Sequence, residues 1–106
     1  MKTQLTVNRK RMNKEKVESL EQARTNIDAI DQTLIELIAA RQFYVDQAAR
    51  FKRTEQDVQS PERTEEVVKK VRGAAEAQGV DPILVEHLYR EMIQHFIRRE
   101  LKEIRP

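Results

Sequence analysis

The sequence has no cysteine and no tryptophan, only two glycines and three prolines, and no long apolar run. The absence of cysteine excludes disulfides, thiolate metal sites and a cysteine nucleophile. Two glycines cannot build a phosphate-cradling loop, which argues against the common nucleotide-binding motifs. No run approaches the roughly 18 apolar residues of a membrane span, and the N-terminus lacks the apolar core of a signal peptide. We therefore expect a cytoplasmic protein without a membrane partner.

The 106 residues are 39% apolar and 36% charged, which is the balance of an amphipathic helical domain. The net charge of +2 is unevenly spread, because residues 1 to 18 hold six Lys and Arg against two Glu. We predict that 1–18 is a basic, flexible N-terminal extension and that 19–106 is a single helical domain.

Helix signals fall into three blocks, and strand signals are nearly absent. The first block begins near Ser19, with Gln22 completing a capping-box pattern, and continues without Gly or Pro to about Arg53. The second begins at Ser60-Pro61 and ends before Gly79, and the third begins at Asp81-Pro82 and continues to the C-terminus. The sequence predicts an all-α fold with one long, one short and one medium helix.

The long helix indicates an oligomer. About 35 residues would extend roughly 50 Å at 1.5 Å per residue, whereas the radius of gyration of a compact domain of this size is about 13 Å. Its apolar stripe needs more surface to pack on than its own chain provides, and a second copy can supply that surface. We expect an intertwined homodimer.

Cations interrupt the apolar stripe. At heptad spacing one row of the long helix is wholly apolar: Ala23, Ile30, Leu37, Tyr44 and Phe51. Arg41 stands in the row beside it, and Arg24 and Lys52 stand one row further on. A buried cation without a partner costs several kcal/mol, about as much as or more than the roughly 1.5 to 3 kcal/mol that a Leu there would contribute. The three cations suggest a bound anion; the alternative is that each reaches solvent.

Other charged residues are less informative. Arg63, in the first turn of the second helix, could reach the same anion or lie on a solvated surface. Glu100 lies beside apolar positions of the third helix, and the pattern alone favours a surface charge near the end of that helix. His87 and His95 are eight residues apart and form no i, i+4 metal pair, so we expect surface or interface histidines and no metal site.

Five segments occur in an order and spacing that resemble a known family. They are ARTNIDAID with Arg24, LIAAR with Arg41, AARFK with Lys52, PERTEEVV with Arg63, and LYREMIQHFIRRELK near the C-terminus. Together they cover about residues 19 to 104 and resemble the all-helical chorismate mutases and their close relative, isochorismate pyruvate lyase.

The resemblance implies a dimer with two active sites that bind a small dicarboxylate, chorismate or isochorismate, without a cofactor. Arg24, from the partner's long helix, and Arg41 would bind the two substrate carboxylates, since a planar guanidinium suits bidentate contacts. Lys52 would act on the ether oxygen of the enolpyruvyl group, and Arg63 would be a further substrate contact. The expected reaction is the pericyclic rearrangement of chorismate to prephenate.

Three positions depart from the family. Typical mutases carry Asp where this chain has Ser60 and Glu where it has Thr64, and that Glu accepts a hydrogen bond from the C4 hydroxyl of chorismate. Isochorismate carries its hydroxyl elsewhere on the ring, so the lyase, which forms salicylate and pyruvate, is the alternative activity. Many members have Gln where this chain has Glu100. A Gln amide donates at any pH, whereas Glu donates only when protonated, so we expect turnover to favour acid pH.

A non-enzymatic alternative is a helical dimerisation or adaptor module. The basic extension would then bind RNA, a membrane or an acidic partner through sequence-independent charge. Against this, the extension lies outside the matching segments and has no aromatic residue to stack on bases, so we expect no nucleic-acid partner.

Overall fold

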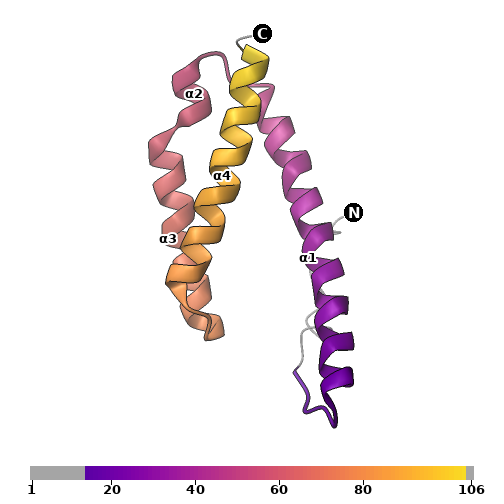
Figure 1. Ribbon diagram of the computed structural model, residues 1–106. Coiled ribbons are helices and arrows are strands. Elements are labelled where there is room, and N and C mark those ends of the chain that lie inside the picture. Colours follow the sequence, from indigo (N-terminus) through magenta and orange to yellow (C-terminus); the bar gives the residue numbers. More distant parts are fainter. Residues whose placement is uncertain (1–13, 105–106) are drawn as a thin grey trace, which may run out of the picture. The chain divides into compact units, whose positions relative to one another are not determined.

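The computed structural model describes residues 14–104 and is all-α over that range (Figure 1). Its helices are α1 (Leu20–Ala49), α2 (Glu55–Gln59), α3 (Pro61–Gln78) and α4 (Pro82–Ile104). The predicted fold class and the three principal helices are confirmed, and the short α2 is an addition that was not predicted. The chain divides into two units, the first reaching Tyr44 and the second beginning at Val45. The predicted extension 1–18 lies mostly outside the described residues.

Local hydrogen bonds start α1 where the capping pattern predicted. The Ser19 hydroxyl accepts from the Gln22 amide at 3.1 Å, and the Gln22 side chain accepts from the Glu18 amide at 2.7 Å. Thirty residues follow without Gly or Pro, so α1 is about 45 Å long. No residue of α1 is buried, and Ile27, Ile30 and Leu34 each expose more than half of their surface. The predicted core face of the long helix is therefore exposed within the first unit.

The predicted end of α1 at Arg53 is wrong, because the helix ends at Ala49. The amides of Arg50, Phe51 and Lys52 donate to the carbonyl groups three residues before them, at 3.0 to 3.2 Å, which tightens the chain into a turn. As a result, Lys52 lies in the segment that connects α1 to α2 and does not continue the helical row of Arg24.

A capping box starts α2. The Thr54 hydroxyl accepts from the Asp57 amide at 3.1 Å, and Asp57 Oδ2 accepts from the amides of Thr54 at 3.1 Å and Arg53 at 2.9 Å. These amides hold the pKa of Asp57 below its ordinary value, because they stabilise the charged carboxylate. The same contacts favour a new helix start over the continuation of α1.

Ser60 joins α2 to α3 with a backbone conformation that is rare for residues with a side chain. Its φ is 27° and its ψ is 73°, and Pro61 follows as the first residue of α3. The predicted start of α3 is confirmed, but the Ser60 side chain makes no capping hydrogen bond. An N-cap side chain usually acts from extended backbone, which Ser60 does not have.

Helices α3 and α4 form an antiparallel pair and lie side by side (Figure 1). Gly79 ends α3 as predicted: its φ is 74°, and Val80 N donates to Ala75 O at 2.8 Å. The buried apolar residues of the described chain all lie in α2, α3 and α4: Val58, Val68, Ala75 and Phe96. The second unit thus holds a small core.

Ion pairs connect α3 and α4 outside this core. Arg90 donates to both carboxylate oxygens of Glu65, at 2.9 and 3.0 Å, and to Glu86 at 2.7 Å. Arg72 donates to the same Glu86. The hydrogen bonds from Arg90 hold the pKa of Glu65 below its ordinary range. Hydrogen bonds from Arg90 and Arg72 do the same for the pKa of Glu86. Arg90 therefore links α4 to α3 through Glu65.

Candidate active site

Lys52 and Glu100 meet in the second unit. Lys52 Nζ donates to Glu100 Oε1 at 3.0 Å, and the two side chains are 28% and 8% exposed. The interpretation of Glu100 as a surface charge is therefore wrong. Glu100 lies one helical turn after the core residue Phe96 on the same face of α4, and both residues are buried.

This pair places the Lys52 ammonium beside the Glu100 carboxyl group, which can be ionised or protonated. An ionised carboxylate accepts hydrogen bonds only, whereas a protonated one also donates. A buried carboxylate needs a compensating partner, and Lys52 supplies it here. With a substrate oxygen between them, Lys52 and a protonated Glu100 could both donate to it; an ionised Glu100 would compete with that oxygen for the ammonium.

A second ion pair, which sequence reasoning missed, lies beside the first. Arg99 Nη2 donates to Asp46 Oδ1 at 2.5 Å, and the Arg99 guanidinium lies 5.2 Å from the centre of the Phe96 ring. Asp46 and Arg99 are 53 residues apart in the sequence, so no local pattern could have linked them.

Three further predicted substrate contacts lie at the start of α3 and form no part of the Lys52–Glu100 ion pair: Arg63, Thr64 and Ser60. Arg63 donates to Glu66 at 2.7 Å, and both side chains are more than half exposed. That hydrogen bond holds the pKa of Glu66 below its ordinary value. Thr64 and Ser60 are half-buried, Thr64 in the first turn of α3 and Ser60 at its junction with α2.

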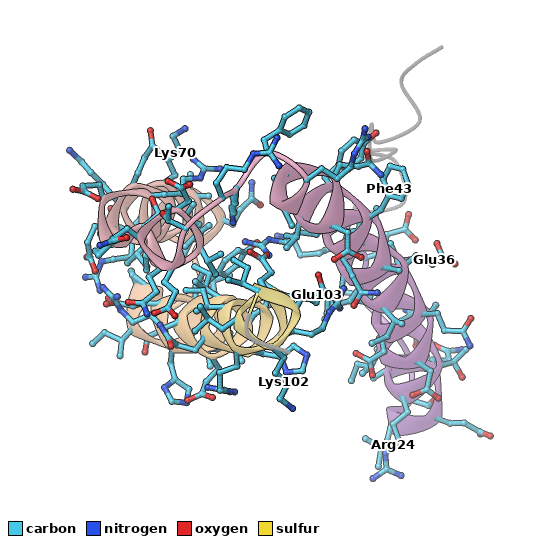
Figure 2. All side chains as sticks on the ribbon, turned by 90° about the horizontal axis from the view of Figure 1, so that it is seen from above. Arg24, Glu36, Phe43, Lys70, Lys102 and Glu103 are labelled. Carbon is cyan, nitrogen blue, oxygen red and sulfur yellow. The ribbon has the colours of Figure 1, made fainter. Side chains whose placement is uncertain are left out.

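Arg24 and Arg41 belong to the first unit, and both lie on α1. Arg24 is exposed near the start of the helix, where its side chain stands away from the ribbon (Figure 2), and Arg41 is half-buried. The 17 residues between them correspond to about 25 Å along one helix. Two guanidinium groups so far apart on one helix cannot both hold one molecule with a single six-membered ring.

The histidines lie on the surface, as predicted. His87 and His95 are both exposed, and the ring of His95 packs edge-on against Phe96 with the ring centres 5.1 Å apart. Across residues 14–104, His, Asp and Glu side chains form no group that could hold a metal ion. None of the helices in that range is long and apolar enough to cross a membrane.

Residues 23–101 match the family described as chorismate mutase type II, and this stretch includes every candidate site residue from Arg24 to Glu100. The chain belongs to the chorismate mutase type II family, which confirms the resemblance seen in the sequence, and it is an enzyme of the chorismate mutase-like type. Among curated proteins it is similar to an isochorismate pyruvate lyase of Pseudomonas aeruginosa. The two are 33% identical over 79 residues, which cover 74% of this chain and 78% of the relative.

Proposed function

We propose that this protein is an isochorismate pyruvate lyase that releases pyruvate from isochorismate and leaves salicylate. The observation that carries this choice is Thr64, a neutral hydroxyl at the position where typical mutases have Glu to bind the C4 hydroxyl of chorismate. Isochorismate has no need of that contact. The similarity to an isochorismate pyruvate lyase supports the same choice.

The proposed chemistry needs positioning and positive charge, and no cofactor. The C–O bond of the enolpyruvyl ether breaks while a ring hydrogen moves to the enolpyruvyl methylene, so that pyruvate leaves and the ring becomes aromatic. Negative charge develops on the ether oxygen, where Lys52 donates a hydrogen bond that strengthens as the bond breaks. Arg41 and the partner's Arg24 bind the carboxylates and select the compact conformer of the substrate.

Arg63 joins the site by leaving Glu66. The Arg63–Glu66 pair is largely exposed, and such pairs contribute only about 0 to 1 kcal/mol, so a substrate carboxylate can displace Glu66 at small cost. The hydroxyl groups of Ser60 and Thr64 supply neutral contacts at the start of α3. Glu100 holds the Lys52 ammonium through the hydrogen bond at 3.0 Å, and the ether oxygen of the substrate would accept from the same ammonium.

Chorismate mutase activity is the second candidate. A threonine hydroxyl can still accept a hydrogen bond from the C4 hydroxyl of chorismate, although more weakly than a carboxylate does. The match of residues 23–101 to the chorismate mutase type II family supports this activity. Prephenate formation from chorismate would use Lys52 and Arg41 in the same roles.

We also propose that the enzyme is a homodimer with shared sites. The separation of about 25 Å between Arg24 and Arg41 along α1 means that one substrate needs these arginines from two chains. The uncovered apolar residues of α1 would be buried by the partner's helices.

The test is to incubate the purified protein separately with isochorismate and with chorismate, and to follow salicylate by fluorescence and prephenate by its acid conversion to phenylpyruvate. We expect salicylate at the higher kcat/KM, and its loss in Arg41→Ala and Lys52→Ala. In Thr64→Glu, salicylate formation should fall relative to prephenate formation. Prephenate at the higher kcat/KM in the wild type would establish the mutase instead, and neither product would favour the adaptor module.

A further inference from the structure

Two neighbouring residues of α4 hold the end of α1 and the segment that follows it. Arg99 donates to Asp46 in the last turn of α1 at 2.5 Å, and Glu100 accepts from Lys52 at 3.0 Å. The two ion pairs have opposite polarity along α4, so each α4 residue can bind only its own partner. The turn that ends α1 lies between Asp46 and Lys52.

Arg99 is itself held in place from the core. Its guanidinium lies 5.2 Å from the centre of the Phe96 ring, and Phe96 is only 6% exposed. A planar guanidinium stacked on a fixed ring loses little further freedom when it binds a carboxylate. Asp46 is thus linked through Arg99 to a buried residue of the second unit's core.

Substrate binding makes the ion pair between Arg99 and Asp46 important. When a substrate oxygen takes the Lys52 ammonium, its hydrogen bond to Glu100 weakens. The backbone around Lys52 is then held on one side by the hydrogen bond of Arg53 to Asp57, and on the other by Asp46 with Arg99. Between these anchors, the amides of Arg50, Phe51 and Lys52 make short-range turn bonds.

We propose that Arg99 is a positioning residue that acts through Asp46 to keep Lys52 at the reacting oxygen. This inference rests on the proposed role of Lys52 in catalysis. The Arg99 and Asp46 side chains are 36% and 46% exposed, and ion pairs so exposed contribute little to folding stability. The effect of Arg99 should therefore be seen in the position of the Lys52 segment and in turnover, and much less in unfolding.

The first experiment needs no substrate. Hydrogen exchange at the amides of Arg50, Phe51 and Lys52 is measured in the full chain and in Arg99→Gln. Exchange should be faster in the variant, because the turn has lost its tie to α4. The matched control is Arg98→Gln, which removes the same charge from the exposed neighbouring position and should leave these amides unchanged. Equal exchange in Arg99→Gln and the wild type would overturn the proposal.

The second experiment separates positioning from binding. We expect Arg99→Gln to lower kcat about 10-fold with little change in KM, since a misplacement of about 1 Å can cost up to about 100-fold in rate. Arg99→Lys should recover part of the loss, and Arg98→Gln should keep wild-type kcat. The double variant Asp46→Asn/Arg99→Gln should be no slower than Arg99→Gln, because both changes break the same ion pair between Asp46 and Arg99.

The outcomes separate this inference from the proposed function. Additive losses in the double variant, or full activity in Arg99→Gln while Lys52→Ala is inactive, would overturn the positioning role alone. Full activity in Lys52→Ala would overturn the catalytic role of Lys52 and this inference with it.

Discussion

The two side chains of the Lys52–Glu100 ion pair differ in how deeply they are buried. The Glu100 side chain is 8% exposed, whereas that of Lys52 is 28% exposed and can turn its ammonium to water. A carboxylate left without its partner in a buried position keeps the full cost of its lost hydration. The stability of the pair should therefore depend on which partner is removed.

We predict that Lys52→Met destabilises the protein by about 1 to 3 kcal/mol, because it leaves a buried acceptor unsatisfied. Glu100→Gln keeps an oxygen that can accept from Lys52, so its cost should be below about 1 kcal/mol. Urea unfolding at neutral pH, followed by circular dichroism, measures both changes. Equal losses for the two variants would show that the carboxylate is not the constrained partner.

The ends of the helices are decided by local backbone chemistry. Gly79 ends α3 in the left-handed region with a φ of 74°, whereas Gly73 lies inside the same helix. A Cβ built at either glycine would meet no atom within 4 Å. Replacement of either glycine therefore tests conformation without steric clashes.

We predict opposite effects for the same substitution at these two positions. Gly79→Ala should destabilise the protein by about 1 to 2 kcal/mol, because an L side chain disfavours the left-handed region. Gly73→Ala should stabilise it by about 0.5 to 1 kcal/mol through helix propensity. Thermal unfolding of the two variants is the measurement, and a shift of the same sign in both would contradict the assignment of Gly79 as the helix end.

The start of α2 should be sensitive to acid. The amides of Arg53 and Thr54 hold the pKa of Asp57 below its ordinary value of 3.8. A carboxyl group whose pKa is lower in the folded than in the unfolded state stabilises the fold above the unfolded value, and this contribution is lost as pH falls through the folded value. We predict that the stability gap between the wild type and Asp57→Ala narrows as the pH is lowered from neutral to below 3.8. Unfolding free energies across that range test this, and a constant gap would contradict it.

At the scale of the whole molecule, α1 is the element with the most uncovered apolar surface. Ile27, Ile30 and Leu34 are 54%, 54% and 51% exposed, while the second unit has its own small core. Exposed apolar residues repeated along 30 residues of helix are typical of an interface, and a second copy with the same surface can cover it.

We predict that two inactive variants restore activity when their chains are mixed. Arg24→Ala and Lys52→Ala should each be inactive alone. In a dimer that takes Arg24 from one chain and Lys52 from the other, half of the randomly mixed dimers have one intact site, which gives about a quarter of wild-type activity. Chains refolded together and assayed for turnover provide the measurement, and sedimentation confirms the dimer. No recovery in a mixture that does form dimers would place Arg24 outside the shared site.

The sequence by itself determined the elements and the family. Pro61, Gly79 and Pro82 act through their own backbone restrictions, so the limits of α3 and the start of α4 were predictable from neighbours in the chain. The sequence also contains the capping-box pattern of Thr54 and Asp57 that starts α2, although no helix was predicted there. Ordered segments such as AARFK and PERTEEVV were enough to indicate the chorismate mutase-like class that the family match confirms.

Only the tertiary structure decided the surroundings of the candidate catalytic groups. The sequence pattern favoured Glu100 as a surface charge near a helix end, whereas in the structure it is a buried partner of Lys52. Lys52 and Glu100 are 48 residues apart, and Asp46 and Arg99 are 53 apart. Hydrogen-bond and helix-cap patterns act over a few residues, whereas these pairs form only when α4 returns alongside the end of α1, and that return depends on the packing of the whole second unit.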